Sequence, residues 1–99
     1  MGGPATRELN SNIAGALENQ GYTITGGGGR LPEEYIPGIG PGWKGGTYVD
    51  ITATDGKTTI RVQTVDTYAD GTPIAREAAA AQRIWNAFPN DKLRLIPKR

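Results

Sequence analysis

The side chains that could carry out chemistry in this chain are carboxylates, amides and basic groups, because its 99 residues include no histidine and no cysteine. The absence of cysteine excludes disulfides, thiolate nucleophiles and most structural zinc sites. The absence of histidine excludes Ser-His-Asp triads, two-histidine ribonuclease chemistry, zinc deaminases and HNH-type nucleases. Aspartate and glutamate with an oxygen-preferring divalent cation are the most direct chemistry that remains.

Asp50 and Gln63 are the first candidates for such a site. Asp50 lies in a run of alternating polar and apolar residues, 47–54, and Gln63 lies in a second run, 58–67. An Asp-Gly pair between the runs is a strong hairpin signal, so we expect them to pair as neighbouring strands. If the apolar face is buried under a helix, Asp50 and Gln63 project together from the opposite face. The alternative is that Asp50 is an ordinary solvent-facing strand residue.

Glu8 and Arg61 extend this pair to a candidate metal site. Glu8 lies in the first turn of an expected helix that must pack near the sheet, and Arg61 precedes Gln63 by two residues. Two or three oxygen ligands that converge and leave open positions are the usual design of a magnesium or manganese site acting on phosphate. We therefore expect Asp50, Gln63 and Glu8 to hold Mg²⁺ or Mn²⁺ and Arg61 to contact the phosphate.

Four other polar residues could contribute, each with an ordinary alternative. Arg76 could meet phosphate with Glu77 orienting it, or the two could be an exposed pair in the first turn of a helix. Lys44 lies among glycines that would let a phosphate backbone approach, although the run lacks the spacing of a P-loop. Asp66 is favoured as a turn residue over a further ligand.

Two more features are compatible with nucleic-acid binding. Tyr35 and Trp43 could stack on bases, or could be hydrophobic anchors of the loop that contains them. The first 56 residues carry a net charge of −3 and the remaining 43 carry +4. This asymmetry would suit a basic nucleic-acid face near an acidic metal site, and it would equally suit a solvated surface.

The elements that must position these residues follow from hydrophobic periodicity and turn signals. Residues 26–46 contain nine glycines and three prolines, too many for a regular element, so we expect a functional loop there. Thr72 is expected to cap the second helix with Pro73 in its first position. The expected elements are helices over 5–20 and 72–88 and strands over 22–25, 47–54, 58–67 and 92–97.

Together these elements predict one small α+β domain, residues 1–99, with the order α-β-β-β-α-β and a mixed sheet covered by helices. The longest apolar run, Ala78–Ala81, is far shorter than the roughly 20 residues that span a bilayer. We therefore expect no membrane segment in this domain.

This order is similar to the minimal core of the PD-(D/E)XK restriction-endonuclease-like nucleases. About two thirds of the chain also resembles C-terminal toxin domains of bacterial polymorphic toxins, of the Rhs and contact-dependent inhibition types. The stretches that carry this second resemblance are Tyr35–Gly38, Gly45–Thr52, Arg61–Thr67, Arg76–Ala80 and Leu95–Lys98.

In the nuclease superfamily a helical Glu, a strand Asp and an acid-x-Lys on the next strand bind metal and cut phosphodiesters. The resemblance implies that Glu8 takes the helical position, Asp50 the strand Asp and Gln63 the second acid, since an amide oxygen can also bind a hard cation. Val65 stands where the lysine belongs, which is a departure from the pattern. Either the missing cation comes from Lys44, Lys57 or Arg61, or the domain is not a standard member of the superfamily.

The resemblance implies a metal-dependent nuclease toxin that cuts the DNA or tRNA of a competing bacterial cell. Such a domain would be delivered as part of a larger secreted protein, act in the target-cell cytoplasm and be neutralised by a cognate immunity protein. Two alternatives stay open: a non-catalytic module that binds nucleic acid or protein, and a histidine-free toxin that consumes NAD or transfers a group.

Overall fold

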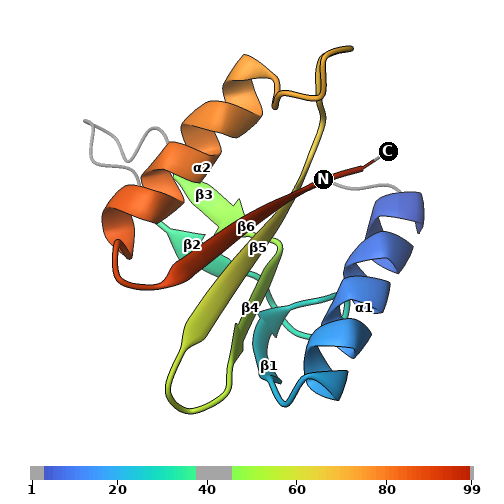
Figure 1. Ribbon diagram of the computed structural model, residues 1–99, viewed down its shortest axis with the longest axis vertical. Helices are drawn as coiled ribbons and strands as arrows, with labels where there is room; N and C mark the ends of the chain where they lie inside the picture. Colours follow the sequence, from blue (N-terminus) through green and yellow to red (C-terminus); the bar gives the residue numbers. More distant parts are fainter. Residues whose placement is uncertain (1–3, 38–45, 99) are drawn as a thin grey trace.

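Two helices and six strands make up the part of the chain that the computed structural model describes, residues 4–37 and 46–98 (Figure 1). Their order confirms the predicted alternation of a helix, a set of strands, a second helix and a last strand. The elements are α1 (Pro4–Asn19), β1 (Thr23–Gly27), β2 (Glu34–Ile36), β3 (Thr47–Val49), β4 (Ile51–Thr54), β5 (Thr59–Val65), α2 (Ala75–Ala87) and β6 (Lys92–Pro97).

The main sheet has the strand order β1-β4-β5-β6, and β2 pairs with β3 in a separate two-stranded sheet. Strand β4 is antiparallel to both of its neighbours, β1 and β5, whereas β6 is parallel to β5. A parallel pair needs a crossover connection, and α2 supplies it between β5 and β6 (Figure 1). The predicted α+β class with a mixed sheet is therefore confirmed.

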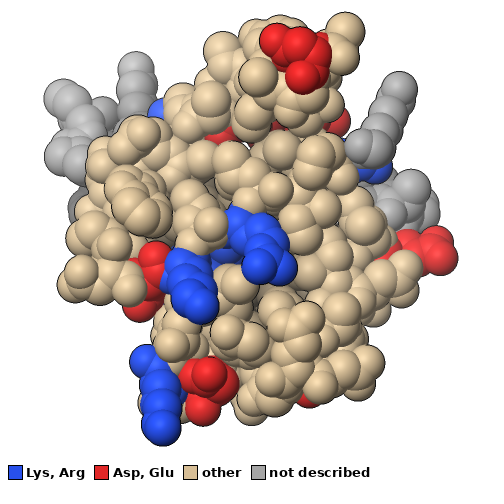
Figure 2. Space-filling model, in the orientation of Figure 1, with Lys and Arg blue, Asp and Glu red and all other residues tan. Residues whose placement is uncertain are grey.

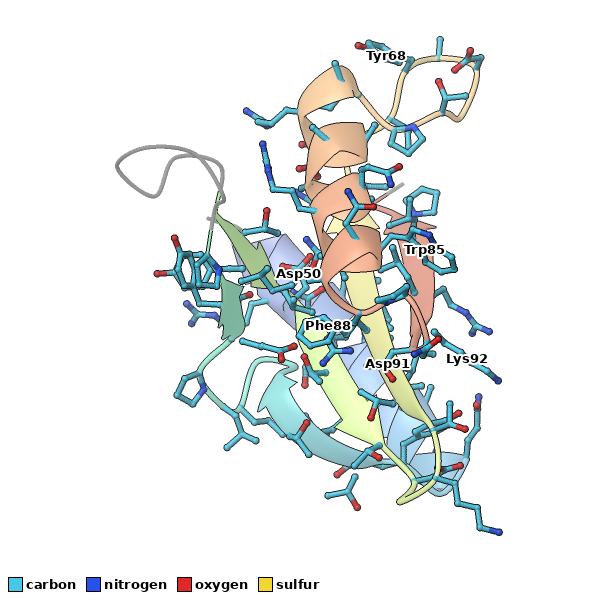
Figure 3. The ribbon with its side chains drawn as sticks, turned by 90° about the vertical axis from the view of Figure 1, so that its left-hand side faces the viewer. Asp50, Tyr68, Trp85, Phe88, Asp91 and Lys92 are labelled. Atoms are coloured by element: carbon cyan, nitrogen blue, oxygen red, sulfur yellow. The ribbon has the colours of Figure 1, made fainter. Side chains whose placement is uncertain are left out.

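The two helices cover opposite faces of the main sheet, and each face has its own hydrophobic cluster (Figure 3). On the α1 side, Ala14 and Leu17 of the helix pack with five buried residues of the sheet: Ile24, Ile51, Ala53, Ile60 and Val62. On the α2 side, Ile84 packs with Ile36 and Val49 of the small sheet. The small sheet thus belongs to the α2 half of the core.

The prediction of one continuous strand over residues 47–54 is wrong. The chain bends at Asp50 and forms two short strands, β3 and β4, in different sheets. Val49 and Ile51 are two residues apart, so their side chains would point to the same face of one continuous strand. They belong instead to the clusters on opposite sides of the main sheet. The backbone of Asp50 has partners outside the main ladder: its N–H donates to Gln63 Oε1 at 2.6 Å, and its carbonyl accepts from Gly28 N–H at 2.9 Å.

The backbone at Gly27 approaches the backbone at Asp50 so closely that only glycine fits there. Gly27 has φ +65°, and a Cβ atom placed on it would lie 1.9 Å from the carbonyl oxygen of Asp50. The expectation that residues 26–46 hold no regular element is also wrong. Strand β1 continues to Gly27, which pairs with Ile51, and β2 lies inside the glycine-rich segment.

The second helix begins later than predicted. Its N-cap residue is Ile74, which makes no side-chain capping bond. Thr72 instead bonds to Asp70, and Pro73 forms a bridge with Thr67. These local bonds hold the segment before α2 in a turn, and they occupy the hydroxyl that was expected to cap the helix.

Substituting Gly27 by alanine tests the close approach at the bend. We expect Gly27→Ala to lower the free energy of unfolding by about 3 kcal/mol, because both the positive φ and the clash with the Asp50 carbonyl must be relieved. Gly21→Ala is the matched control, since Gly21 has φ +97° but no atom within 4 Å of the place that an added Cβ would take. It should cost only about 1 kcal/mol. Equal losses in urea unfolding would contradict the role of close approach.

Candidate active site

A hollow of about 540 Å³ lies beside Asp50, between the bend, the end of β5 and the first turns of α2. Figure 3 shows Asp50 next to α2, close to the junction of β3 with β4. The charged residues that line the hollow are the carboxylates Glu33, Asp50 and Glu77 and the cations Arg76, Arg83 and Lys98. Four separate parts of the chain therefore contribute charge to one hollow.

The carboxylate of Asp50 is held by Thr64. Its Oδ2 atom accepts the backbone N–H of Thr64 at 2.9 Å and lies 3.0 Å from the Thr64 hydroxyl oxygen. That hydroxyl also lies 3.1 Å from Oδ1 of Asn10, a buried residue of α1. It has a single proton, and donation to the charged carboxylate makes the stronger bond. Asp50 is thus fixed in place from β5, next to Asn10 of α1.

Glu33 is the acidic neighbour of Asp50. Tyr35 pairs with Tyr48 in the β2–β3 ladder and Glu34 pairs with Val49, so Glu33 comes opposite Asp50 at the next step. The pKa of Glu33 is raised above its ordinary value of 4.5, first by burial and then by repulsion from, and a hydrogen bond with, the Asp50 carboxyl group. Two neighbouring carboxylates repel each other, and a proton or a cation between them relieves the repulsion.

The cations of the hollow come from α2 and from the end of β6. Arg83 donates to the hydroxyl of Thr47 at 3.3 Å, which directs it along β3. Arg76 and Lys98 have nitrogen atoms 3.8 Å and 3.7 Å from Oδ2 of Asp66. With a proton or a metal ion between Glu33 and Asp50, the charges that line the hollow sum to a positive value, which favours an anion.

Gln63 lines the hollow as expected, but both ends of its side chain already have backbone partners. Its oxygen accepts the N–H of Asp50 at 2.6 Å, and its nitrogen donates to the carbonyl of Tyr48 at 3.2 Å. Gln63 is also only 9% exposed. The Gln63 side chain therefore stabilises the bend by replacing backbone hydrogen bonds of the ladder. Its oxygen is already used as an acceptor and is not presented to a metal ion.

The structure does not bring Glu8 or Lys57 to the hollow. Glu8 is exposed, and Asn10, two residues later and therefore about 200° further around the helix, is the α1 residue that faces Thr64. Lys57 lies in the turn between β4 and β5, whereas Asp50 lies at the opposite end of β4. Lys44 and Trp43 lie outside the described residues.

Arg61 is a structural residue, in contrast to the predicted phosphate contact. Its side chain is 7% exposed and forms ion pairs with Glu34 at 2.8 Å and Asp91 at 2.5 Å. Its guanidinium carbon also lies 3.5 Å from the centre of the Phe88 ring. Figure 3 shows Phe88 and Asp91 near the C-terminal end of α2. Arg61 thus joins β5 to the small sheet and to the turn after α2.

This ion pair contributes stability that depends on pH. Hydrogen bonding by Arg61 is the largest cause that holds the pKa of Glu34 below its ordinary value of 4.5. A carboxylate with a lowered pKa in the folded state contributes its full stability above the unfolded value. That contribution is lost as the pH falls through the lowered pKa.

The donor set fits a divalent ion only in a revised form. Among residues 4–37 and 46–98, no group of three or more His, Cys, Asp or Glu side chains has metal-binding geometry. Magnesium, however, is commonly bound through one or two carboxylates, with waters and substrate phosphates completing its shell. Glu33 and Asp50 form such a pair, and no third carboxylate is needed.

The sequence does not predict several residues that line the hollow. Glu33 was missed because its position opposite Asp50 depends on the pairing of β2 with β3, two strands of three residues each. Lys98 and Arg83 were missed because nothing in the local pattern distinguishes them from other exposed cations. Figure 2 shows Lys and Arg side chains over β6. Lys92 and Arg94 of this strand are exposed, and the sequence pattern does not predict a basic surface there.

A scan against models of known protein families finds no match, and neither the curated proteins nor the solved structures give one. Neither of the two described helices has the length and hydropathy of a bilayer-spanning segment. Function must therefore be argued from the geometry of the hollow.

Replacement of Arg61 tests its structural role. Arg61→Met should lower the free energy of unfolding by about 2–3 kcal/mol, because it leaves Glu34 and Asp91 without their shared cation. Arg30→Met is the matched control, since Arg30 pairs with Glu18 at the surface and both side chains are 43% exposed. It should cost about 0.5 kcal/mol. Denaturant unfolding of both variants measures the difference, and an Arg61 variant as stable as the control would refute the role.

Proposed function

We propose that this domain is a nuclease that hydrolyses phosphodiester bonds with the help of a divalent cation, and that the hollow at Asp50 is its active site. The observation that carries the proposal is the position of Glu33 opposite Asp50, just beyond the end of the β2–β3 ladder, in a hollow lined by three carboxylates and three cations. A carboxylate pair suits a hard divalent ion, and neighbouring Arg and Lys side chains suit phosphate. A hollow lined by both carboxylates and cations combines these two requirements.

The ion, when bound by Glu33 and Asp50, supplies an activated water and neutralises charge on the phosphate. The residues around it have distinct tasks. Thr64 fixes the Asp50 carboxylate through its N–H and hydroxyl groups. Arg76 and Arg83 bind the phosphate oxygens, for which the planar guanidinium group offers paired donors.

Lys98 supplies the cation that the PD-(D/E)XK pattern places at the position of Val65. Val65 is buried, so its own side chain cannot reach substrate. Strands β5 and β6 are parallel, and the backbone N–H of Lys98 donates to the carbonyl of Val65 at 3.0 Å. The Lys98 side chain lines the hollow next to this position. In this proposal the lysine has moved from β5 to the residue that follows β6.

The biological setting implied by the resemblance belongs to the same proposal. The domain would be delivered as the C-terminal part of a larger secreted toxin, would cut DNA or tRNA in the cytoplasm of a competing cell, and would be blocked by a cognate immunity protein. The α-β-β-β-α-β order of α1, the main sheet and α2 supports only the nuclease part of this proposal, because the nuclease superfamily has the same minimal order.

A non-catalytic nucleic-acid-binding module is the second candidate. The buried Val65 favours it, because a domain that has lost the lysine of the pattern could keep a phosphate-binding surface without cleavage. Salt-dependent binding of nucleic acid with no cleavage in any divalent metal would identify this function.

Cleavage assays with charge-removing variants test the proposed active site. Incubated with plasmid DNA and with total tRNA in Mg²⁺ or Mn²⁺, the protein should cleave at least one of them, and EDTA should stop the reaction. Asp50→Asn and Glu33→Gln should each lower the rate about 100-fold or more, as loss of a group that stabilises a transition state commonly does. Lys98→Met should also lower the rate, by about 10-fold or more.

Glu8→Gln is the matched control, because it removes a carboxylate that lies outside the hollow. It should cleave at the rate of the unchanged protein. A fully active Glu33→Gln variant, or cleavage that persists in EDTA, would refute the metal site proposed here.

A further inference from the structure

The two-stranded sheet carries an exposed pair of aromatic rings. Tyr35 of β2 and Tyr48 of β3 are direct cross-strand partners, and their ring centroids lie 4.8 Å apart at an interplanar angle of 48°. The two residues are 45% and 61% exposed. Their neighbours Ile36 and Val49, which point to the opposite face, are buried against α2. The tyrosine rings are therefore not part of the hydrophobic core.

The hollow that contains the carboxylate pair reaches the aromatic pair through Tyr48. Tyr48 lines the hollow together with Glu33 and Asp50, which lie just beyond the end of the β2–β3 ladder. The aromatic pair and the carboxylate pair are thus neighbours at one hollow.

The backbone accommodates the aromatic pair. A Cβ atom on Gly46 would lie 2.0 Å from the hydroxyl oxygen of Tyr35, so glycine at this position leaves room for the ring where it lies. Gly46 also lines the hollow. The ring of Tyr35 therefore lies at the edge of the hollow that we propose for the phosphate.

We propose that Tyr35 and Tyr48 form a stacking surface for an unpaired base of the nucleotide whose phosphate occupies the hollow. This inference rests on the proposed function and adds to it the class of substrate, a single-stranded or looped nucleic acid. Tyrosine rings stack on any base, whereas both faces of a base within a duplex are already covered by its neighbours. Duplex nucleic acid would place its phosphate in the hollow without contact between a base and the tyrosines.

Fluorescence polarisation with labelled six-nucleotide strands tests this proposal, in EDTA so that no cleavage occurs. The probes are a DNA strand, an RNA strand, the DNA strand with an abasic residue at every position, and a short duplex. The unchanged protein should bind a base-bearing strand about 10-fold more tightly than the abasic strand or the duplex, since stacking on an aromatic side chain contributes about that factor per base. The DNA and RNA arms show which sugar is preferred.

Tyr48→Ala should lose this 10-fold preference, and Tyr48→Phe should retain it, because phenylalanine keeps the ring. Trp85→Ala is the control for loss of an exposed aromatic residue, since Trp85 lies on the side of α2 away from β2 and β3 (Figure 3). It should behave as the unchanged protein. Circular dichroism verifies that each variant is folded.

Equal binding of base-bearing and abasic strands by the unchanged protein would overturn the stacking proposal, as would a Tyr48→Ala variant with the preference intact. Neither result affects the cleavage assays, so the nuclease proposal is judged separately. A protein that prefers base-bearing strands but cleaves none would retain the stacking surface and lose the nuclease proposal.

Discussion

The bend of the chain at Asp50 is the constraint on which the rest of the structure depends. It allows one run of residues to serve both hydrophobic clusters, because Val49 packs against α2 and Ile51 packs against α1. The bend leaves the backbone of Asp50 outside the main ladder, and the side chain of Gln63 and the N–H of Gly28 bond to it instead. Buried backbone groups need such partners, so these residues are as necessary to the fold as the apolar core.

The same bend creates the electrostatic problem that defines the site. It sets the carboxyl group of Asp50 against that of Glu33, a contact that is unfavourable unless a proton or a metal ion lies between them. Elsewhere the chain places a buried cation between carboxylates, as Arg61 does between Glu34 and Asp91. Around Asp50 the cations line the walls of a hollow and leave space for a ligand. This difference separates the structural ion pairs from the candidate active site.

The sequence predicted the features that depend on local pattern. Hydrophobic periodicity located both helices and the strands of the main sheet, and a local hairpin was enough to bring Asp50 and Gln63 to one hollow. The bend itself was not predictable from alternation, because it is held by a glutamine side chain and by glycines more than 20 residues away. Propensity rules also favoured Thr72 as a helix cap, where a nearby aspartate binds its hydroxyl instead.

The partners of Asp50 were the part of the site that sequence reasoning could not assign. A family pattern suggested Glu8, but the phase of α1 turns Asn10 toward the site. Glu33 and Lys98 reach the hollow through the pairing of β2 with β3 and of β5 with β6, both of which join distant segments. Residue type alone did not distinguish them from other exposed charges.

Binding of Mn²⁺, measured by the loss of the free-ion electron paramagnetic resonance signal, tests most directly whether Glu33 is the partner of Asp50. The proposed site predicts saturable binding by the unchanged protein and by Glu8→Gln, and binding at least about 10-fold weaker in Glu33→Gln and Asp50→Asn, since each loses one of two carboxylate ligands. Unchanged Mn²⁺ affinity in Glu33→Gln, together with lost affinity in Glu8→Gln, would contradict it.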